Sequence, residues 1–211
     1  MPYEYLRDPA AIYRRSFELI RKEGDFSRLP KELHPLAMRL VHAVADPSIL
    51  ADLIWSEGAV DAGRRALGRG APVLVDAQMV AHGIIRARLP AGNAVTCLLD
   101  DPAVLALSRQ HKTTRSAAAL ELWVPLLDGA VVAIGNAPTA LFRLLELIEA
   151  GAPHPALVLG FPVGFVGAAE SKTALEANRF GIAFVALAGR RGGSALAAAA
   201  VNALAGGEVG Q

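Results

Sequence analysis

The segment AVVAIGNAPTALFRLLELIEAGAPHPALVLG, residues 130–160, decides the fold class of this chain. It opens with a short apolar run at 130–134, continues through a helical pattern at 139–150, and closes on a second apolar run at 156–159. Neither run alternates with polar residues, which is typical of strands that are covered on both faces. Two such strands around a helix predict a parallel pair with a covering helix.

The same alternation extends in both directions from this segment. Further candidate strands lie at 72–76, 94–99 and 182–187, and further helical patterns at 102–109, 114–127, 170–178 and 194–204. The pattern predicts an α/β fold with a mainly parallel five-stranded sheet flanked by helices, a Rossmann-like three-layer arrangement.

The first seventy residues show helical patterns. Asp8-Pro9 supplies an N-cap and a proline for the first turn of a helix that Gly24 ends. A second helix is expected from Pro35 to the Asp46-Pro47 pair, and a third over 59–67. We therefore expect a single domain over 1–211, with a helical N-terminal segment (1–70), an α/β region (71–205) and a flexible tail (206–211).

The composition excludes several classes of protein. The 211 residues are 53% hydrophobic and carry 21 basic and 20 acidic side chains. Because these charges nearly cancel, the protein has no overall positive charge that would favour binding of nucleic acid. Cys97 is the single cysteine, and the five histidines lack metal-site spacing, so neither a disulfide nor a metal site is expected. Without an 18-residue apolar run or a signal peptide, we expect a soluble cytoplasmic protein that does not bind a membrane.

Polar and glycine-rich turns follow the candidate strands, where ligands of open α/β sheets bind. The residues of interest are Asn136, Thr139, Lys172, Arg190 and Arg191 in these turns or just after them, together with Thr114 and Arg115 at the start of the helix expected over 114–127. Arginines and free amides at a helix start favour an anion. For any single turn, the alternative is that its glycines only permit tight backbone geometry. Neither a dinucleotide-binding nor a P-loop pattern is present.

Arginine accounts for 17 of the 21 cations, which favours carboxylate or phosphate partners, although a GC-rich genome explains the same bias. His42 lies on the predicted second helix, where a packed or capping role competes with proton transfer. Arg14-Arg15-Ser16 interrupts the first amphipathic helix, and a solvated face explains it equally well.

Five strings in order carry a family resemblance over nearly the whole chain. They are VHAVAD (41–46), TRSAAA with ELW (114–123), GNAPTAL (135–141), GFPVGFVGAAESK (160–172) and GRRGGS (189–194). Together they resemble precorrin-8X methylmutase, also called precorrin isomerase, of cobalamin biosynthesis.

The resemblance implies an isomerase that moves a methyl group from C-11 to C-12 of the tetrapyrrole precorrin-8X, a 1,5-sigmatropic shift that gives hydrogenobyrinate without a cofactor. The family's catalytic histidine matches His42, which would give a proton to the macrocycle and take it back. A substrate contact of the family matches Ser16, with Arg15 beside it. The cations and hydroxyls at the strand ends would bind the peripheral carboxylates and the ring.

The resemblance also implies a homodimer with product transfer to the next pathway enzyme, and the stretch 84–90 favours the cobalt-free substrate. The alternative functions are a non-catalytic carrier of hydrogenobyrinate and a nucleotide-dependent enzyme on a Rossmann-like sheet. Retention of His42 in its motif argues against a passive carrier.

Overall fold

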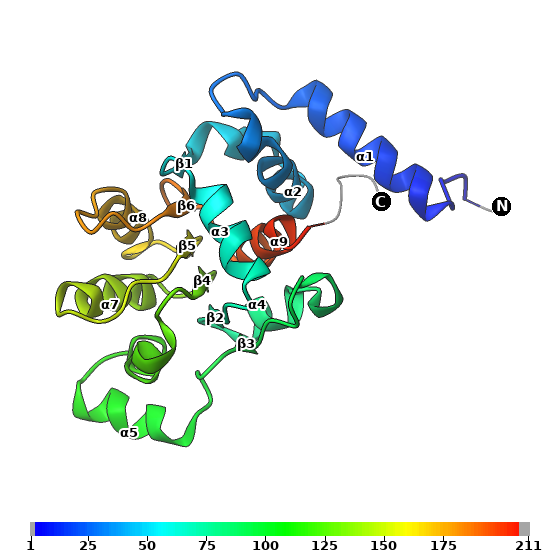
Figure 1. Cartoon of the computed structure of the whole chain (residues 1–211). Helices are drawn as coiled ribbons and strands as arrows, with labels where there is room; N and C mark the ends of the chain where they lie inside the picture. The colour runs from blue at the N-terminus through cyan, green and yellow to red at the C-terminus, as the bar shows by residue number, and fades with distance from the viewer. Residues whose placement is uncertain (1–2, 207–211) are drawn as a thin grey trace.

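A six-stranded sheet lies between two layers of helices in the computed structural model, which describes residues 3–206 (Figure 1). The strand order is β1-β6-β5-β4-β2-β3, and every neighbouring pair is parallel except β1 with β6. The strands are β1 (Leu53–Trp55), β2 (Val73–Val75), β3 (Val95–Thr96), β4 (Val131–Ile134), β5 (Leu157–Gly160) and β6 (Phe184–Leu187). The predicted three-layer, mainly parallel α/β fold is confirmed.

Nine α-helices and four 3-10 helices surround the sheet within residues 3–206. The α-helices are α1 (Pro9–Glu23), α2 (His34–Val44), α3 (Ala59–Gly68), α4 (Gln78–Gly83), α5 (Pro102–Gln110), α6 (Arg115–Ala119), α7 (Pro138–Glu149), α8 (Ala168–Glu176) and α9 (Ser194–Leu204). The 3-10 helices are η1 (Lys31–Leu33), η2 (Pro47–Asp52), η3 (Arg86–Arg88) and η4 (Leu120–Leu126). Helices α2, α3, α4 and α9 lie on one side of the sheet, and α7 and α8 lie on the other (Figure 1).

Side chains of alternate strand residues enter two separate cores. In β4, Val131 and Ala133 join the core shared with α2 and α9, whereas Val132 and Ile134 join the core under α7. The apolar runs that identified the strands therefore arise because both faces of each strand are buried.

The prediction of five strands was wrong by one, because it missed β1. Leu53–Trp55 pairs antiparallel with the end of β6, so the segment 1–70 contributes a strand as well as helices. Three residues are too few to show either an apolar run or an alternation. The helix α4 was also missed, because six residues are too few to show a helical period. Pro125 lies in the second half of the helix predicted over 114–127, which is 3-10 helix in the structure.

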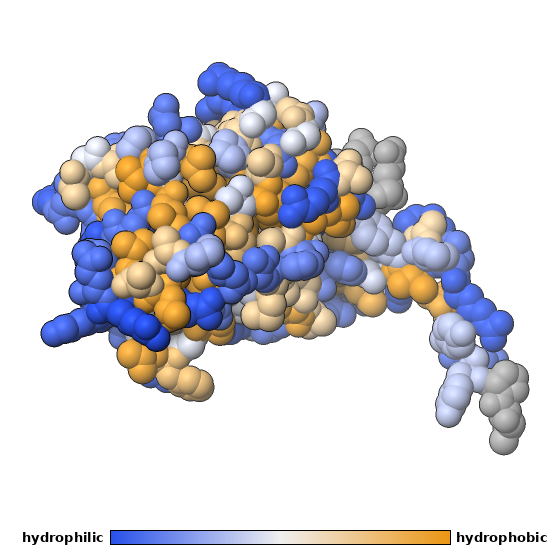
Figure 2. Space-filling view, turned by 90° about the horizontal axis from the view of Figure 1, so that it is seen from below, coloured by the Kyte–Doolittle hydropathy of each residue, from blue (hydrophilic) through white to orange (hydrophobic). Residues whose placement is uncertain are grey.

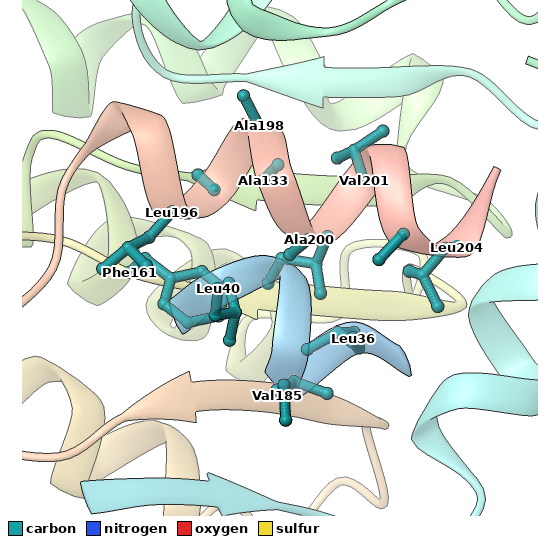
Figure 3. Packing of buried hydrophobic residues seen from close by; sticks show 14 of the residues in the cluster. Leu36, Leu40, Ala133, Phe161, Val185, Leu196, Ala198, Ala200, Val201 and Leu204 are labelled. Carbon is teal, nitrogen blue, oxygen red and sulfur yellow. The ribbon is translucent and has the colours of Figure 1, made fainter. Parts of the chain in front are cut away.

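Helix α2 is anchored through its inner face. Leu36 and Leu40 point toward Val185 of the sheet and toward α9, where Ala200 leaves room for them (Figure 3). Both leucines are almost fully buried. Burial of a leucine side chain contributes about 1.5–3 kcal/mol, so this contact fixes the position of α2 on the sheet.

Helix α1 projects from the body and is held mainly at its second half (Figures 1 and 2). Asp8 caps it as predicted, accepting a hydrogen bond from the backbone N–H of Ala11 at 2.8 Å, and Phe17 and Ile20 are its buried residues. Within residues 3–206, no helix has the length and apolar character needed to cross a membrane. The predicted flexible tail, Gly206 apart, lies outside the described residues.

Candidate active site

The carboxyl ends of the parallel strands meet at one edge of the sheet, and Asp76 organises the turn after β4 there. Its buried carboxylate accepts hydrogen bonds from the backbone N–H groups of Gly135, Asn136 and Ala137 at 2.8, 3.0 and 2.7 Å. Burial raises the pKa of the Asp76 carboxyl, and the three backbone donors oppose that shift. Asp76 thus fixes the backbone from which the exposed side chain of Asn136 projects.

The predicted residues of α6 and α7 lie beside this turn. The hydroxyls of Thr114 and Thr139 are 2.8 Å apart, and Thr114 also caps α6 by accepting from the Ala117 N–H. Arg115 donates to the carboxylate of Asp100 at 2.8 Å and to the Leu99 carbonyl at 3.0 Å. Because the ion pair is largely exposed, it is worth little energetically and leaves Arg115 able to exchange partners.

Lys172, predicted to pair with a substrate carboxylate, has a different role in the structure. It is fully buried, and its ammonium donates to the carbonyls of Pro162 at 3.2 Å and Arg191 at 2.6 Å. Burial lowers the Lys172 pKa from 10.5 to about 8, although the charge of Asp52 opposes the shift. Lys172 therefore joins the loops after β5 and β6 and does not present a charge to solvent.

Arg191 also departs from its predicted role as a carboxylate ligand for substrate. Its guanidinium pairs with Asp46 at 3.0 Å and with Asp52, and it donates to the hydroxyl of Ser48 at 2.7 Å. These partners flank and form η2, which directly follows α2. Arg191 thus ties the C-terminal end of α2 to the sheet edge. Arg190 stays exposed, with its guanidinium carbon 5.5 Å from the ring centre of Phe165.

A pH-dependent stability difference should follow from the buried ammonium of Lys172. Its pKa is lowered on folding, so between pH 8 and 10.5 the folded protein binds fewer protons than the unfolded chain, and stability rises with pH in that window. We expect the free energy of unfolding of wild type, relative to Lys172→Met, to rise by about 2 kcal/mol between pH 7.5 and 10. Urea unfolding of both proteins measures this difference, and a constant difference across the range would contradict it.

His42 lies in a hollow of about 280 Å³ between α1 and α2. The lining residues are Ser16, Leu19, Ile20, Glu23, Val41, His42, Ala45 and Pro47. The exposed imidazole stacks on Phe17 with ring centres 5.1 Å apart, and the edge of Tyr13 lies against it at 5.8 Å. Among the described residues, none hydrogen-bonds its ring nitrogens, so they are free to exchange a proton with a ligand.

The structure brings together two of the predicted site residues, His42 and Ser16, and separates others from them. The Ser16 hydroxyl donates to the Ile12 carbonyl at 2.9 Å, and its oxygen can still accept a bond at the hollow. Arg15 lies on the exposed side of α1, where it pairs with Glu18 at 3.3 Å. None of Arg115, Arg190 and Arg191 lines the hollow, so the arginines do not share a single cavity with His42.

Sequence reasoning missed the residues that position the site. Asp76 is the last residue of the candidate strand 72–76, but no sequence pattern indicates which N–H groups a carboxylate will meet across a fold. The same holds for Asp46 and Asp52, which lie more than a hundred residues from Arg191 in the sequence. Within residues 3–206, no group of three or more His, Cys, Asp or Glu side chains could hold a metal ion.

The comparisons with known proteins cover nearly the whole chain. A model of the Precorrin-8X methylmutase family matches residues 11–206. A protein named Precorrin-8X methylmutase from Sinorhizobium sp is 57% identical over 203 residues, covering 96% of this chain and 97% of that protein. A Cobalt-precorrin-8 methylmutase from Priestia megaterium is 36% identical over 197 residues, covering 93% and 87%.

The fold agrees with a solved structure of the same name. The precorrin-8X methyl mutase from Thermus thermophilus aligns with a TM-score of 0.84 and 43% identity, covering 92% of this chain and 94% of that chain. The sequence and the fold lead to the same conclusion. The chain belongs to the precorrin-8X methylmutase family and is an isomerase of cobalamin biosynthesis.

Proposed function

We propose that this protein converts precorrin-8X to hydrogenobyrinate by a 1,5-sigmatropic shift of a methyl group from C-11 to C-12, with His42 as the proton donor and acceptor. Protonation of the conjugated macrocycle by the imidazolium withdraws electron density and lowers the barrier to migration. The methyl group breaks its bond to C-11 and forms one to C-12, and the proton returns to His42. Substrate and product are isomers, so the reaction balances without a cofactor.

The position of His42 is the observation that carries this proposal. Its ring is held on one side by Phe17 and is exposed on the other, at a hollow that Ser16 shares. A hollow of about 280 Å³ is at the lower end of small-molecule sites, so it accepts an edge of a macrocycle and leaves the remaining rings outside. An edge-on substrate would place one ring against the imidazole.

The remaining rings would lie toward the sheet edge, because Arg191 joins that edge to the end of α2. There Arg115 and Arg190 keep exposed guanidinium groups for the peripheral carboxylates, and Arg15 does so on α1. Asn136, with Thr139 and Thr114, would hydrogen-bond the ring or its side chains. In this proposal Lys172 and Arg191 position the loops and do not contact the substrate.

We assign the cobalt-free ring as the substrate. The Sinorhizobium relative and another from Pseudomonas aeruginosa, each 57% identical to this chain, carry the name Precorrin-8X methylmutase. Relatives named Cobalt-precorrin-8 methylmutase are 32–38% identical to this chain.

A homodimer, with transfer of the product to the next enzyme of the pathway, fits the surface of the protein. Phe165 and Val166 are exposed at 83% and 89%, and Leu6 and Ile12 are exposed on the projecting N-terminal segment. A second subunit would cover such residues and enclose the part of the macrocycle that the hollow leaves outside. Sedimentation equilibrium at micromolar concentration should give twice the monomer mass.

A turnover experiment with excess substrate distinguishes an enzyme from the alternative function, a non-catalytic carrier of hydrogenobyrinate. We expect one equivalent of protein to convert a hundredfold excess of cobalt-free precorrin-8X completely, followed by the change in absorption spectrum. A carrier would bind one equivalent of hydrogenobyrinate and leave precorrin-8X unchanged, and that result would overturn the proposal.

A further inference from the structure

Arg39 is a buried cation for which the described part of the chain provides no partner. Its exposed fraction is 9%, and its Nη2 atom is fully buried without a hydrogen bond. No ion pair or side-chain hydrogen bond joins the guanidinium to any other residue within 3–206. The mechanism proposed above does not use it.

An unpaired guanidinium inside a protein is unfavourable, because the charge loses its hydration and gains nothing in return. Buried charges are therefore paired or bind a ligand of opposite charge. Even arginines of this chain that are only partly buried have acidic partners: Arg143 pairs with Glu121 and Glu146, and Arg191 pairs with Asp46 and Asp52. Arg39 is an exception that a ligand from outside the described chain would resolve.

The position of Arg39 indicates where that ligand would lie. It precedes His42 by three residues on α2, a spacing that places the two side chains about 60° apart around the helix axis and makes them neighbours. Leu36 precedes Arg39 by three residues and therefore neighbours it on the other side, and Leu36 points into the core (Figure 3). The Cβ atom of Arg39 therefore points between the buried face of α2 and the face that carries the imidazole.

A second atom without a partner lies near the imidazole. The hydroxyl of Tyr13 is buried and makes no hydrogen bond, and the Tyr13 ring lies 5.8 Å from the His42 ring. Thus α1 brings an unsatisfied polar side chain close to the His42 ring, and α2 carries the unpaired Arg39 three residues before His42. Buried polar atoms in folded proteins nearly always have partners, so two exceptions beside one exposed histidine are informative.

We propose that Arg39 is a binding residue for one peripheral carboxylate of the tetrapyrrole, held beside the ring that His42 protonates. The identity of this ligand rests on the proposed function. A planar guanidinium accepts a carboxylate through two parallel hydrogen bonds, which fixes orientation as well as affinity. Binding there would set which edge of the macrocycle faces the imidazole.

The variant Arg39→Met tests the proposal because it keeps an unbranched apolar stem and removes the charged guanidinium. We expect its Kd for hydrogenobyrinate, measured by absorption titration, to be about 10- to 100-fold weaker than that of wild type. Arg64→Met, which removes an exposed arginine on α3, is the matched control and should bind as wild type does. Fully esterified hydrogenobyrinate should bind wild type and Arg39→Met equally, because the ester offers no carboxylate.

Thermal unfolding without ligand distinguishes a binding residue from a structural one. Loss of a purely structural arginine would lower the unfolding temperature. Removal of an unpaired buried charge should leave the unfolding temperature of Arg39→Met equal to or higher than that of wild type. A lower unfolding temperature, or dissociation of a dimer, would show that Arg39 already has a protein partner and would overturn the proposal. An unchanged Kd would also overturn it.

Failure of this inference is distinguishable from failure of the proposed function. If wild type converts precorrin-8X and Arg39→Met binds hydrogenobyrinate equally well, only the carboxylate subsite is wrong. If wild type neither binds hydrogenobyrinate nor converts precorrin-8X, the proposed function itself is wrong, and the subsite falls with it.

Discussion

Replacing His42 with alanine is expected to lower kcat for the methyl shift about 100- to 10,000-fold, the range that general acid–base catalysis contributes. The imidazole is the titratable ring that the hollow between α1 and α2 presents, stacked on Phe17. Alanine leaves the helix intact because it has the highest helix propensity and His42 is exposed. The loss should therefore fall on kcat, measured under saturating substrate, and much less on the affinity for hydrogenobyrinate.

His82→Ala is the matched control for this substitution. His82 is also an exposed histidine near the end of a helix, and its ring contacts the Gln78 carbonyl at 2.7 Å. We expect it to retain wild-type kcat. If His42→Ala kept more than a tenth of the wild-type kcat, His42 would not be the proton donor.

Replacing Asp76 with alanine is expected to reduce the free energy of unfolding by about 3–5 kcal/mol, because three backbone N–H groups would lose a buried acceptor. Those groups belong to Gly135, Asn136 and Ala137, which connect β4 to α7. The turn is also constrained sterically: a Cβ atom on Gly135 would lie 2.8 Å from the Cα of Ser194. The backbone consequently cannot relax toward α9 to find new partners.

Urea unfolding measures this loss, and hydrogen exchange of the three amides localises it. Protection of these amides should fall in Asp76→Ala before that of the strands does. Asp128→Ala removes an exposed carboxylate and should stay within about 0.5 kcal/mol of wild type. A loss below about 1 kcal/mol in Asp76→Ala would mean that water replaces the carboxylate at little cost.

Local signals in the sequence were sufficient for most of the fold. Asp8, Pro9 and Gly24 place the ends of α1 because capping and termination depend on neighbouring residues alone. The predicted helix 194–204 has the bounds of α9. By contrast, β1 is defined by its pairing with β6, more than a hundred residues away, and three residues carry no period of their own.

Some residues of the candidate site could likewise be predicted from the sequence, and others could not. His42 and Ser16 could be placed together because a family motif identifies the first and a family contact the second, and the structure puts both in one hollow. The sequence could not show which charged residues at the strand ends bind a ligand. An arginine beside a glycine-rich turn gives the same sequence pattern whether it contacts a ligand or another loop. Arg191 meets Asp46 and Asp52, and Lys172 meets two carbonyls, partners that depend on how distant segments pack.

The migrating methyl group can be followed directly. Cobalt-free precorrin-8X labelled with carbon-13 in the C-11 methyl group should be incubated with one hundredth of an equivalent of wild-type protein and analysed by carbon-13 NMR. We predict that the whole labelled signal moves to the shift of a methyl group on C-12, while the same amount of His42→Ala leaves it on C-11 over the same time. A label that stays on C-11 with wild-type protein, or that moves equally fast with His42→Ala, would contradict the account.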